Sequence, residues 1–337
     1  MYLYAAWMFV NLSTNVKYAF LTFTSILCIY FVYKNCEKNE PHTNQLSLQN
    51  NGQNRQLIIY NRTGSTTLTN SIAYDLCHLN GFSVIHVNTS KNIYTMNAAD
   101  QADFVYNIST WTERIPAFYH GHLAFINFPK YGFSNPLYIN LIREPVERFL
   151  SYYYFLRFGD DFRVGLKRSK AGNNETFDQC FKRRGKDCDV EKLWLQIPYF
   201  CGNENYCREP GNRMALEAAK RHLVENYLVV GYTDRLTDMI TILEKLLPAF
   251  FRNATSHYNN LTAKKAHLRT TLKKIEPTSE TLALLKSEPI VQMETDFYNF
   301  AVREFDLLYD RLIDSNTREF SPKQYRFEKI QGASKAL

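Results

Sequence analysis

The sequence lacks the features that mark nucleic-acid-binding and zinc-binding proteins. Its 40 Lys and Arg residues against 33 Asp and Glu residues give a formal net charge of +7, but they form no long basic run and belong to no nucleic-acid-binding motif. Closely spaced C-x2-C pairs, which zinc knuckles use, are also missing. We therefore expect neither a nucleic acid nor a metal ion as partner. The moderate positive excess suits either a polyanionic partner or an ordinary basic protein.

A full-length hydrophobic membrane span is also missing. Residues 18–33 carry no charge and lie between Lys17 and Lys34, so the run is shorter than the roughly 20 residues that a span usually needs. Thin early-secretory membranes accept short spans, and no good small-residue cleavage site follows Tyr33. We therefore prefer an uncleaved signal anchor over residues 17–34 to a cleaved signal peptide. Residues 1–16 would form a cytoplasmic tail, the polar residues 35–55 a stem, and residues 56–325 the lumenal domain.

The cysteines that are present favour an oxidising compartment. An even set of four lies in one loop-rich segment with C-x7-C and C-x5-C spacing, which reads as two disulfides rather than a metal site. Spacing does not fix their pairing, although neighbours pair most simply. Triplets for N-glycosylation also agree with a secretory protein. The cysteines are Cys180, Cys188, Cys201 and Cys207, and the triplets begin at Asn88, Asn107, Asn174, Asn253 and Asn260.

Strands and helices alternate along the predicted domain. Short apolar runs typical of buried parallel strands occupy residues 56–60, 137–142 and 227–231. A helical pattern follows each run, through residues 73–77, from residue 146 and over residues 234–247, and the C-terminal third is mostly helical. This alternation predicts an α/β domain with a central parallel sheet flanked by helices. Cys77, in the first helical pattern, is expected to be a buried free thiol.

Two strand–loop–helix units carry groups that suit phosphate or sulfate. Residues 61–67 form a loop of small residues, where backbone N–H groups and a helix N-terminus can hold an anion, although a plain capped turn explains them at least as well. Arg143 follows the strand over residues 137–142, and Ser151 lies two turns into the next helix. Both can bind one phosphate, whereas the alternative for Arg143 is an ion pair with a structural carboxylate. Together the units predict a ligand with phosphate-like groups at both ends.

Four segments of the chain resemble the heparan sulfate 2-O-sulfotransferases, of the uronyl 2-O-sulfotransferase family. They are residues 118–122 (Phe-Tyr-His-Gly-His), 143–163 with its Ser-Tyr-Tyr-Tyr-Phe block, 191–198 and 266–271. The resemblance implies a P-loop-NTPase-like sulfotransferase fold with an N-terminal transmembrane helix. It also implies 3′-phosphoadenylyl sulfate (PAPS) as sulfuryl donor, a type II anchor in the Golgi membrane with the catalytic domain in the lumen, and a homotrimer.

The resemblance further implies roles for the residues at the donor and at the reacting hydroxyl. His122 matches the catalytic base. An imidazole suits this role because it titrates near neutral pH and can take the proton of a sugar hydroxyl. His120 matches a histidine that supports activity, and Arg143 and Ser151 match groups that hold the 3′-phosphate of PAPS. The loop around the 5′-phosphosulfate corresponds to Thr63, Gly64, Ser65, Thr66 and Thr67.

Basic residues that grip the acceptor's sulfates and carboxylates are matched by Arg163, Arg168 and Arg269. A solvated basic face is the alternative for Arg168. The family's two disulfides match the pairing of neighbours, Cys180 with Cys188 and Cys201 with Cys207.

The donor loop departs from the family pattern Asn-Arg-Val-Pro-Lys-Thr-x-Ser-Thr. Here Asn61 and Arg62 run directly into Thr63, so the Lys that contacts the transferring sulfuryl group is missing. Loss of such a contact typically reduces the rate by about 10²–10³. Two explanations stay open: Arg62 takes the place of that Lys among the donor-binding residues, or the protein is a weak enzyme or its sequence has lost residues. The gap also creates a glycosylation triplet at Asn61, which we expect to be unmodified because a glycan would block the donor site.

Three functions therefore compete. The first is transfer of a sulfuryl group from PAPS to the 2-hydroxyl of a uronic acid, iduronate, in heparan sulfate, and the Phe-Gly-Asp-Asp-Phe-Arg block and His-Gly-His favour it. The second is the same transfer to dermatan or chondroitin sulfate. The third is a sulfotransferase-like protein that binds heparan sulfate without turnover, which the donor-loop gap alone supports.

Overall fold

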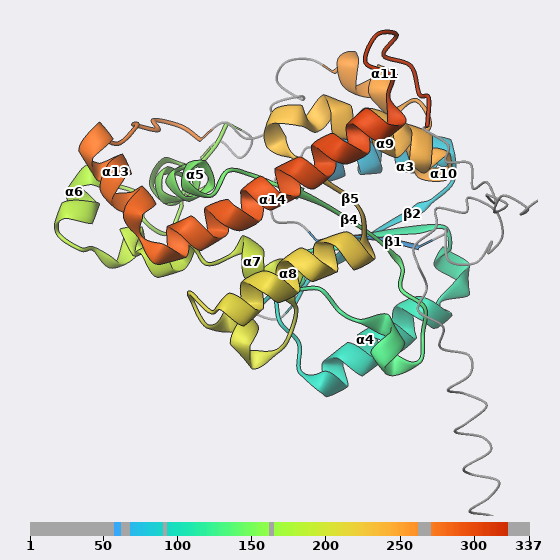
Figure 1. The fold of residues 1–337 in the computed structure, drawn as a ribbon, viewed down its shortest axis with the longest axis horizontal. Coiled ribbons are helices and arrows are strands. Elements are labelled where there is room, and N and C mark those ends of the chain that lie inside the picture. The colour runs from blue at the N-terminus through green and yellow to red at the C-terminus, as the bar shows by residue number, and fades with distance from the viewer. Residues whose placement is uncertain (1–56, 62–67, 90–92, 162–164, 262–270, 323–337) are drawn as a thin grey trace, which may run out of the picture. The chain divides into compact units, whose positions relative to one another are not determined.

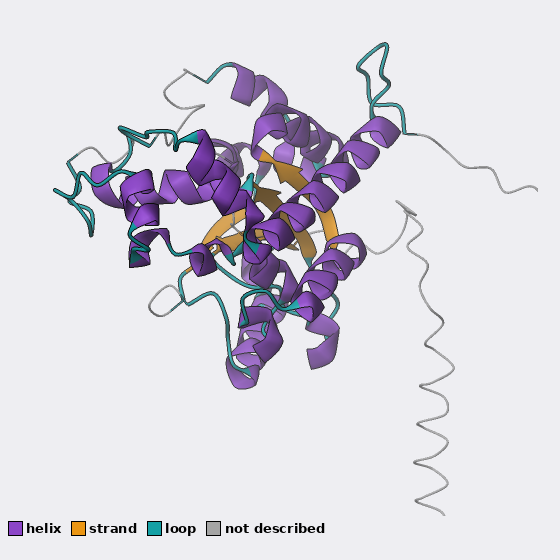
Figure 2. Cartoon of the chain, turned by 60° about the vertical axis from the view of Figure 1, so that its left-hand side comes forward, coloured by secondary structure: helices purple, strands orange, loops and turns teal. Residues whose placement is uncertain are grey.

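A parallel β-sheet forms the centre of the computed structural model, with helices on both of its faces (Figures 1 and 2). The structure describes residues 57–61, 68–89, 93–161, 165–261 and 271–322, which belong to one unit that spans Asn51–Leu337. Within these residues the sheet has five strands in the order β2-β3-β1-β4-β5, and all four pairings are parallel. The strands are β1 (Leu57–Asn61), β2 (Ser83–Val87), β3 (Ala117–Gly121), β4 (Leu137–Ile142) and β5 (Tyr227–Tyr232).

Successive residues of β1 enter two different cores, because side chains alternate across a sheet. Leu57 and Ile59 of β1 pack into a core with α4 (Ala98–Thr110), α7 (Gln196–Cys201) and α8 (Arg213–Asn226). Ile58 and Tyr60 pack into the opposite core. That core lies against a π-helix (Leu68–Ala73), α3 (Tyr74–Asn80), α9 (Leu236–Leu246), α10 (Pro248–Phe251) and α11 (Ala254–Asn259). Burial of both faces explains why β1 and β4 have nearly continuous apolar sequences.

The longest described helix, α14 (Pro289–Leu312), connects the parts of the domain (Figure 1). It contacts β5 and α8, and its residue Phe297 lies in the first core whereas Phe305 lies in the second. Its N-terminal end reaches a third core, which Val291 shares with α5 (Pro145–Phe158), α6 (Phe177–Lys182) and α13 (Ser279–Ser287). A helix of this length spans about 36 Å, so changes near Val291 and near Leu312 affect different cores.

Helix α5 begins at Pro145, one residue before the start that the sequence predicts. The Glu144 side chain accepts a hydrogen bond from the backbone N–H of Glu147 at 2.6 Å, and Pro145 occupies the first turn. A capping carboxylate followed by proline is a favourable helix start. The helix ends at Phe158, and Gly159 follows it with a φ of 76°, which suits glycine.

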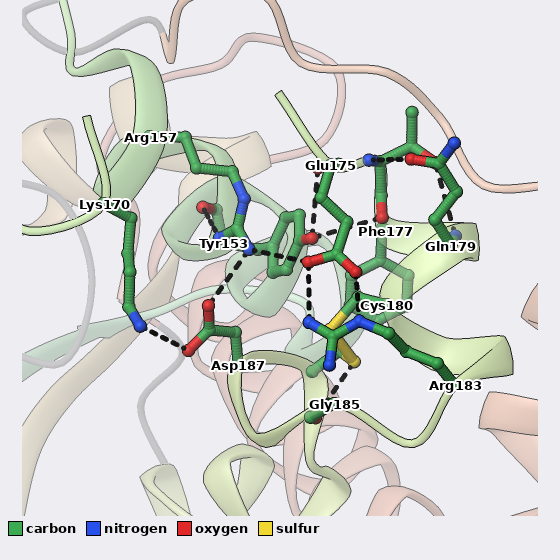
Figure 3. The surroundings of a disulfide bond; sticks show 12 residues. Tyr153, Arg157, Lys170, Glu175, Phe177, Gln179, Cys180, Arg183, Gly185 and Asp187 are labelled. Carbon is green, nitrogen blue, oxygen red and sulfur yellow. Dashed lines mark hydrogen bonds and ion pairs between the residues drawn. A yellow bond between two sulfur atoms is a disulfide. The ribbon is translucent and has the colours of Figure 1, made fainter. Parts of the chain in front are cut away.

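Both disulfides form between neighbouring cysteines, as predicted. Cys180 pairs with Cys188 and Cys201 pairs with Cys207. Figure 3 shows the first of these beside Arg157, Glu175 and Asp187. The remaining described cysteine, Cys77, is a free thiol as expected, but it is partly rather than fully buried. The reason is that it lies beside the buried Leu76 on a helix whose next residues, His78 and Leu79, face solvent.

The predicted strands and helices lie close to their expected positions. The strand over residues 137–142 is confirmed as β4, and those over residues 56–60 and 227–231 are confirmed as β1 and β5 with ends shifted by one residue. Strands β2 and β3 were not predicted. The expected membrane anchor over residues 17–34 lies outside the described residues, and among the described helices none is long and apolar enough to cross a membrane.

Candidate active site

The strand order brings to one edge of the sheet the ends of the three strands that precede predicted site segments. His122 follows β3, the donor loop follows β1, and Arg143 follows β4, and these strands are neighbours in the order β3-β1-β4. Asn61 at the end of β1 is in register with Gly121 at the end of β3. With strand spacings near 4.8 Å, the ends of β3 and β4 lie about 10 Å apart, with β1 between them. Open α/β sheets bind ligands outside the carboxyl ends of their strands, so this edge is the candidate site.

His120 lies in the sheet itself, as the penultimate residue of β3. Its ring is almost fully buried and stacks on the ring of His86, its register partner on β2, with 4.8 Å between centroids. The hydroxyl of Tyr74, on α3, lies 3.0 Å from Nε2 of His120. Neither Tyr74 nor His86 was predicted as a site residue. Their contacts hold His120 in a fixed orientation next to the sheet edge.

Gly121 separates the two histidines because no larger residue fits there. A Cβ atom on Gly121 would lie 2.5 Å from the backbone oxygen of Val87 on β2. Such a contact is too short for real atoms, so the close approach of β2 and β3 requires glycine. The His-Gly-His sequence therefore places one imidazole in the sheet, at His120, and the other, at His122, just beyond its edge.

The imidazole of His122 contacts a tyrosine from a different element. The hydroxyl of Tyr199 on α7 lies 3.2 Å from Nδ1 of His122. When Nδ1–H donates to this hydroxyl, the basic lone pair resides on Nε2, the tautomer that a general base at Nε2 needs. Tyr199 is itself buried and stacks on Tyr94 with 4.9 Å between ring centroids. The aromatic pair thus fixes the group that orients His122.

The backbone that follows His122 is held by the same two tyrosines. The N–H of Ala124 donates to the carbonyl of Tyr94 at 2.8 Å, and the N–H of Phe125 donates to the carbonyl of Tyr199 at 2.8 Å. The side-chain amide of Asn203 donates to the carbonyl of Phe125 at 3.0 Å. These bonds tie the segment after β3 to α7, so the position of His122 depends on where α7 lies.

Arg143 is held through its backbone, whereas its side chain forms only a weak ion pair. Its N–H donates to Oε1 of the buried Gln196 at 3.0 Å. Its guanidinium lies 3.6 Å from Glu147, and both side chains are more than a third exposed, at 35% and 43%. Lys274 contacts the same carboxylate at 2.6 Å. Exposed pairs of this kind contribute little to stability, so the predicted ion-pair alternative exists but does not bury the guanidinium.

Ser151 faces the chain segment that returns from residue 271 onwards. Its hydroxyl lies 2.7 Å from the hydroxyl of Thr271, and the N–H of Leu272 donates to the carbonyl of Gly159 at 3.2 Å. These contacts and the ion pair of Lys274 with Glu147 bring the returning segment against α5, beside the carboxylate that Arg143 also approaches. Hydroxyl and ammonium donors thereby join the guanidinium predicted to hold a phosphate.

Arg168 occupies a less exposed position than a solvated basic face would give it. Its side chain is 11% exposed and donates to Oδ1 of the nearly fully buried Asp160 at 3.1 Å. Its guanidinium also lies over the ring of Phe155, 4.2 Å from the centroid. This geometry assigns Arg168 a structural ion pair, and its contact with an acceptor stays a prediction.

The other predicted site residues lie outside the described residues. They are Arg62, Thr63, Gly64, Ser65, Thr66, Thr67, Arg163 and Arg269.

A parallel sheet with an imidazole and an arginine at its carboxyl edge defines an α/β protein suited to anionic ligands. Residues 17–301 match the model of the sulfotransferase family. The chain is 53% identical over 283 residues to heparan sulfate 2-O-sulfotransferase hst-2 of Caenorhabditis elegans, covering 82% of this chain and 87% of the relative. It is 51% identical over 256 residues to heparan sulfate 2-O-sulfotransferase 1 of Mus musculus and of Homo sapiens, covering 75% of this chain and 71% of each relative. The chain belongs to the sulfotransferase family, in the group of the heparan sulfate 2-O-sulfotransferases.

Proposed function

We propose that the chain transfers the sulfuryl group of PAPS to the 2-hydroxyl of a uronic acid, iduronate, in heparan sulfate. One observation carries this proposal: the short helix α7 contacts both His122 and Arg143, which flank the strand that leads into the donor loop. A base on one side and a phosphate-binding cation on the other suit a donor that lies across the end of β1. The names of the relatives agree with this acceptor.

The proposed reaction uses His122 as general base. Nε2 takes the proton of the 2-hydroxyl while the sugar oxygen bonds to sulfur, and the bond between sulfur and the 5′-phosphate oxygen breaks. The electron pair of that bond leaves with adenosine 3′,5′-bisphosphate. Tyr199 supports the base because its hydroxyl can accept from Nδ1–H before and after protonation. Arg143 and Ser151 would hold the 3′-phosphate, since a guanidinium and a hydroxyl are both donors to phosphate oxygens.

The shortened donor loop is part of the proposal. Arg62 would supply the positive charge that the family's Lys provides where charge develops in the transition state. A guanidinium keeps the charge but lacks the compact reach of an ammonium, so we expect a slower enzyme rather than an inactive one.

The cellular placement is proposed on the same basis. The uncharged residues 18–33 would anchor the protein as a single-pass type II protein in the Golgi membrane. Two formed disulfides support an oxidising lumen for the catalytic domain. A homotrimer and the P-loop-NTPase-like type of sulfotransferase fold follow from the family resemblance.

The test is a transfer assay with the full-length protein in detergent and radiolabelled PAPS. Desulfated heparan and dermatan chains are offered separately, and the products are digested to disaccharides. Label in the 2-O-sulfated heparan disaccharide is the expected result. Label only in dermatan products would replace the acceptor by dermatan sulfate, and no label with retained heparin binding would favour a binding protein. An occupied glycan at Asn61, detected by mass spectrometry, would also contradict an active enzyme.

A further inference from the structure

We propose that Glu294 of α14 is a positioning residue for the sulfotransfer site, which it sets by holding the start of α7. This inference rests on the proposed function. The role of Glu294 needs no direct contact with the proposed base or with the proposed phosphate-binding arginine. It acts instead on the six-residue helix that contacts both of them.

The carboxylate of Glu294 accepts hydrogen bonds from three consecutive backbone N–H groups. Oε1 accepts from Leu195 at 2.9 Å and from Ile197 at 3.0 Å, and Oε2 accepts from Gln196 at 3.2 Å. The first amides of a helix have no partner within the helix, and Leu195, which precedes α7, supplies no side-chain cap. Glu294 therefore does for α7, from about a hundred residues further along the chain, what a capping side chain normally does locally.

The ionised form of Glu294 is the form that this arrangement requires. The side chain is completely buried, and burial raises the pKa of Glu294, while the positive charge of Arg148 and the three N–H donors oppose that rise. A protonated carboxyl would carry a hydrogen where an acceptor is needed. The guanidinium of Arg148 donates to the carbonyl of Leu193 at 2.9 Å, so both charges act on the turn that leads into α7.

A movement of α7 would displace both ends of the site at once. Gln196 and Tyr199 are three residues apart and so lie on neighbouring positions of one helix face. Gln196 accepts the backbone N–H of Arg143, and Tyr199 contacts Nδ1 of His122. Because α7 has only six residues, it has little hydrogen bonding of its own to resist rotation. The buried carboxylate thus fixes the spacing between the proposed base and the proposed phosphate-binding residue.

The test variant is Glu294→Gln, which keeps the shape of the side chain. The amide removes the charge and replaces one acceptor oxygen with an NH2 group that faces a backbone N–H. We expect the Kd of adenosine 3′,5′-bisphosphate to rise about tenfold and kcat to fall about tenfold, as for loss of charge-assisted hydrogen bonds. Titration of the His122 imidazole, followed by NMR, should also shift, because Tyr199 no longer holds a fixed position.

The matched control is Leu312→Ala on the same helix. Leu312 is buried in the second core, 18 residues and about 27 Å further along α14. This variant should lower the unfolding temperature but leave kcat, the Kd and the His122 titration at wild-type values, when all are measured below the onset of unfolding. Wild-type values of all three in Glu294→Gln, or the same changes in both variants, would overturn the inference. If wild-type protein transfers no sulfate, the proposed function fails, while the Kd and the His122 titration still decide the role of Glu294.

Discussion

The hydroxyl of Tyr199 lies 3.2 Å from Nδ1 of His122, although 77 residues separate the two along the chain. The bond joins the segment after β3 to α7 and holds the imidazole of His122 by its Nδ1 edge. The same helix contacts Arg143 through Gln196. Base orientation and donor binding therefore depend on one short element, and the following experiments separate their contributions.

Replacement of His122 by alanine removes the proposed base. We expect kcat to fall by about 10²–10⁴, the range that general-base catalysis contributes. The Kd of adenosine 3′,5′-bisphosphate and the retention on heparin should stay close to wild-type values, because His122 does not belong to the groups assigned to either ligand. A loss of activity below tenfold in the radiolabel assay would show that another group takes the proton.

Tyr199→Phe removes only the hydroxyl that contacts His122. The ring stack on Tyr94 survives, so the fold should be unaffected. A neutral hydrogen bond contributes about 1 kcal/mol, and we expect kcat/KM to fall about fivefold. Tyr94→Phe is the matched control, because it changes the other ring of the stack. An equal loss in both variants would trace the effect to the stack rather than to the bond with His122.

Arg143→Lys keeps the charge at the end of β4 but removes the planar guanidinium. Lysine cannot make the two parallel bonds that hold a phosphate bidentately. We expect the Kd of adenosine 3′,5′-bisphosphate to rise about tenfold, with the KM of the polysaccharide unchanged. Lys130→Met, which breaks an exposed ion pair with Glu204, serves as the charge control. The assignment of Arg143 to the donor is wrong if acceptor KM changes and donor affinity does not.

The strands that sequence patterns predicted are those with nearly continuous apolar runs, such as β4 with Leu-Tyr-Ile-Asn-Leu-Ile. The sequence patterns did not reveal β3, because its five residues end in His-Gly. They did not reveal β2 either, because it is a partly exposed edge strand. The segments that carry the predicted site residues His122 and Arg143 could be recognised from the sequence, and the roles of these residues stay predictions. The contacts of Gln196, Tyr199 and Glu294 could not, because each joins residues 53 to 99 positions apart and no local pattern records such contacts.

Arg168→Leu tests whether this arginine is structural or binds the acceptor. Its partner Asp160 is nearly fully buried, and removing one member of a buried ion pair typically costs about 3–5 kcal/mol. We expect a large fall in the unfolding temperature, and partial recovery when Asp160→Asn is added. Heparin affinity is then measured in the double variant. Wild-type affinity there would remove Arg168 from the acceptor-binding residues, whereas a clear loss would give it both roles.

The charge network around the first disulfide predicts how stability responds to acid (Figure 3). The hydrogen bond from Arg183 lowers the pKa of Glu175 below its ordinary value. Burial works against a low pKa for Asp187, but hydrogen bonds from Lys170 and Arg157 outweigh it and lower the pKa of Asp187 as well. The folded state therefore binds these protons less readily than the unfolded chain. Their stabilisation is complete above the unfolded-state values, near pH 4 to 4.5, and is lost as pH falls through the lower folded-state values.

We accordingly expect the unfolding temperature to change little between about pH 7 and 5 and to fall steeply below about pH 4. In Asp187→Asn the fall of the unfolding temperature below about pH 4, here called the acid limb, should be less steep. The variant has one carboxylate fewer to protonate beside the fully buried side chain of Arg157. Asp310→Asn, at an exposed position of α14, should leave the limb unchanged. The profiles are measured by circular dichroism with the disulfides intact, so that pH alone varies. Parallel acid limbs in wild type and Asp187→Asn would show that the network does not control acid stability.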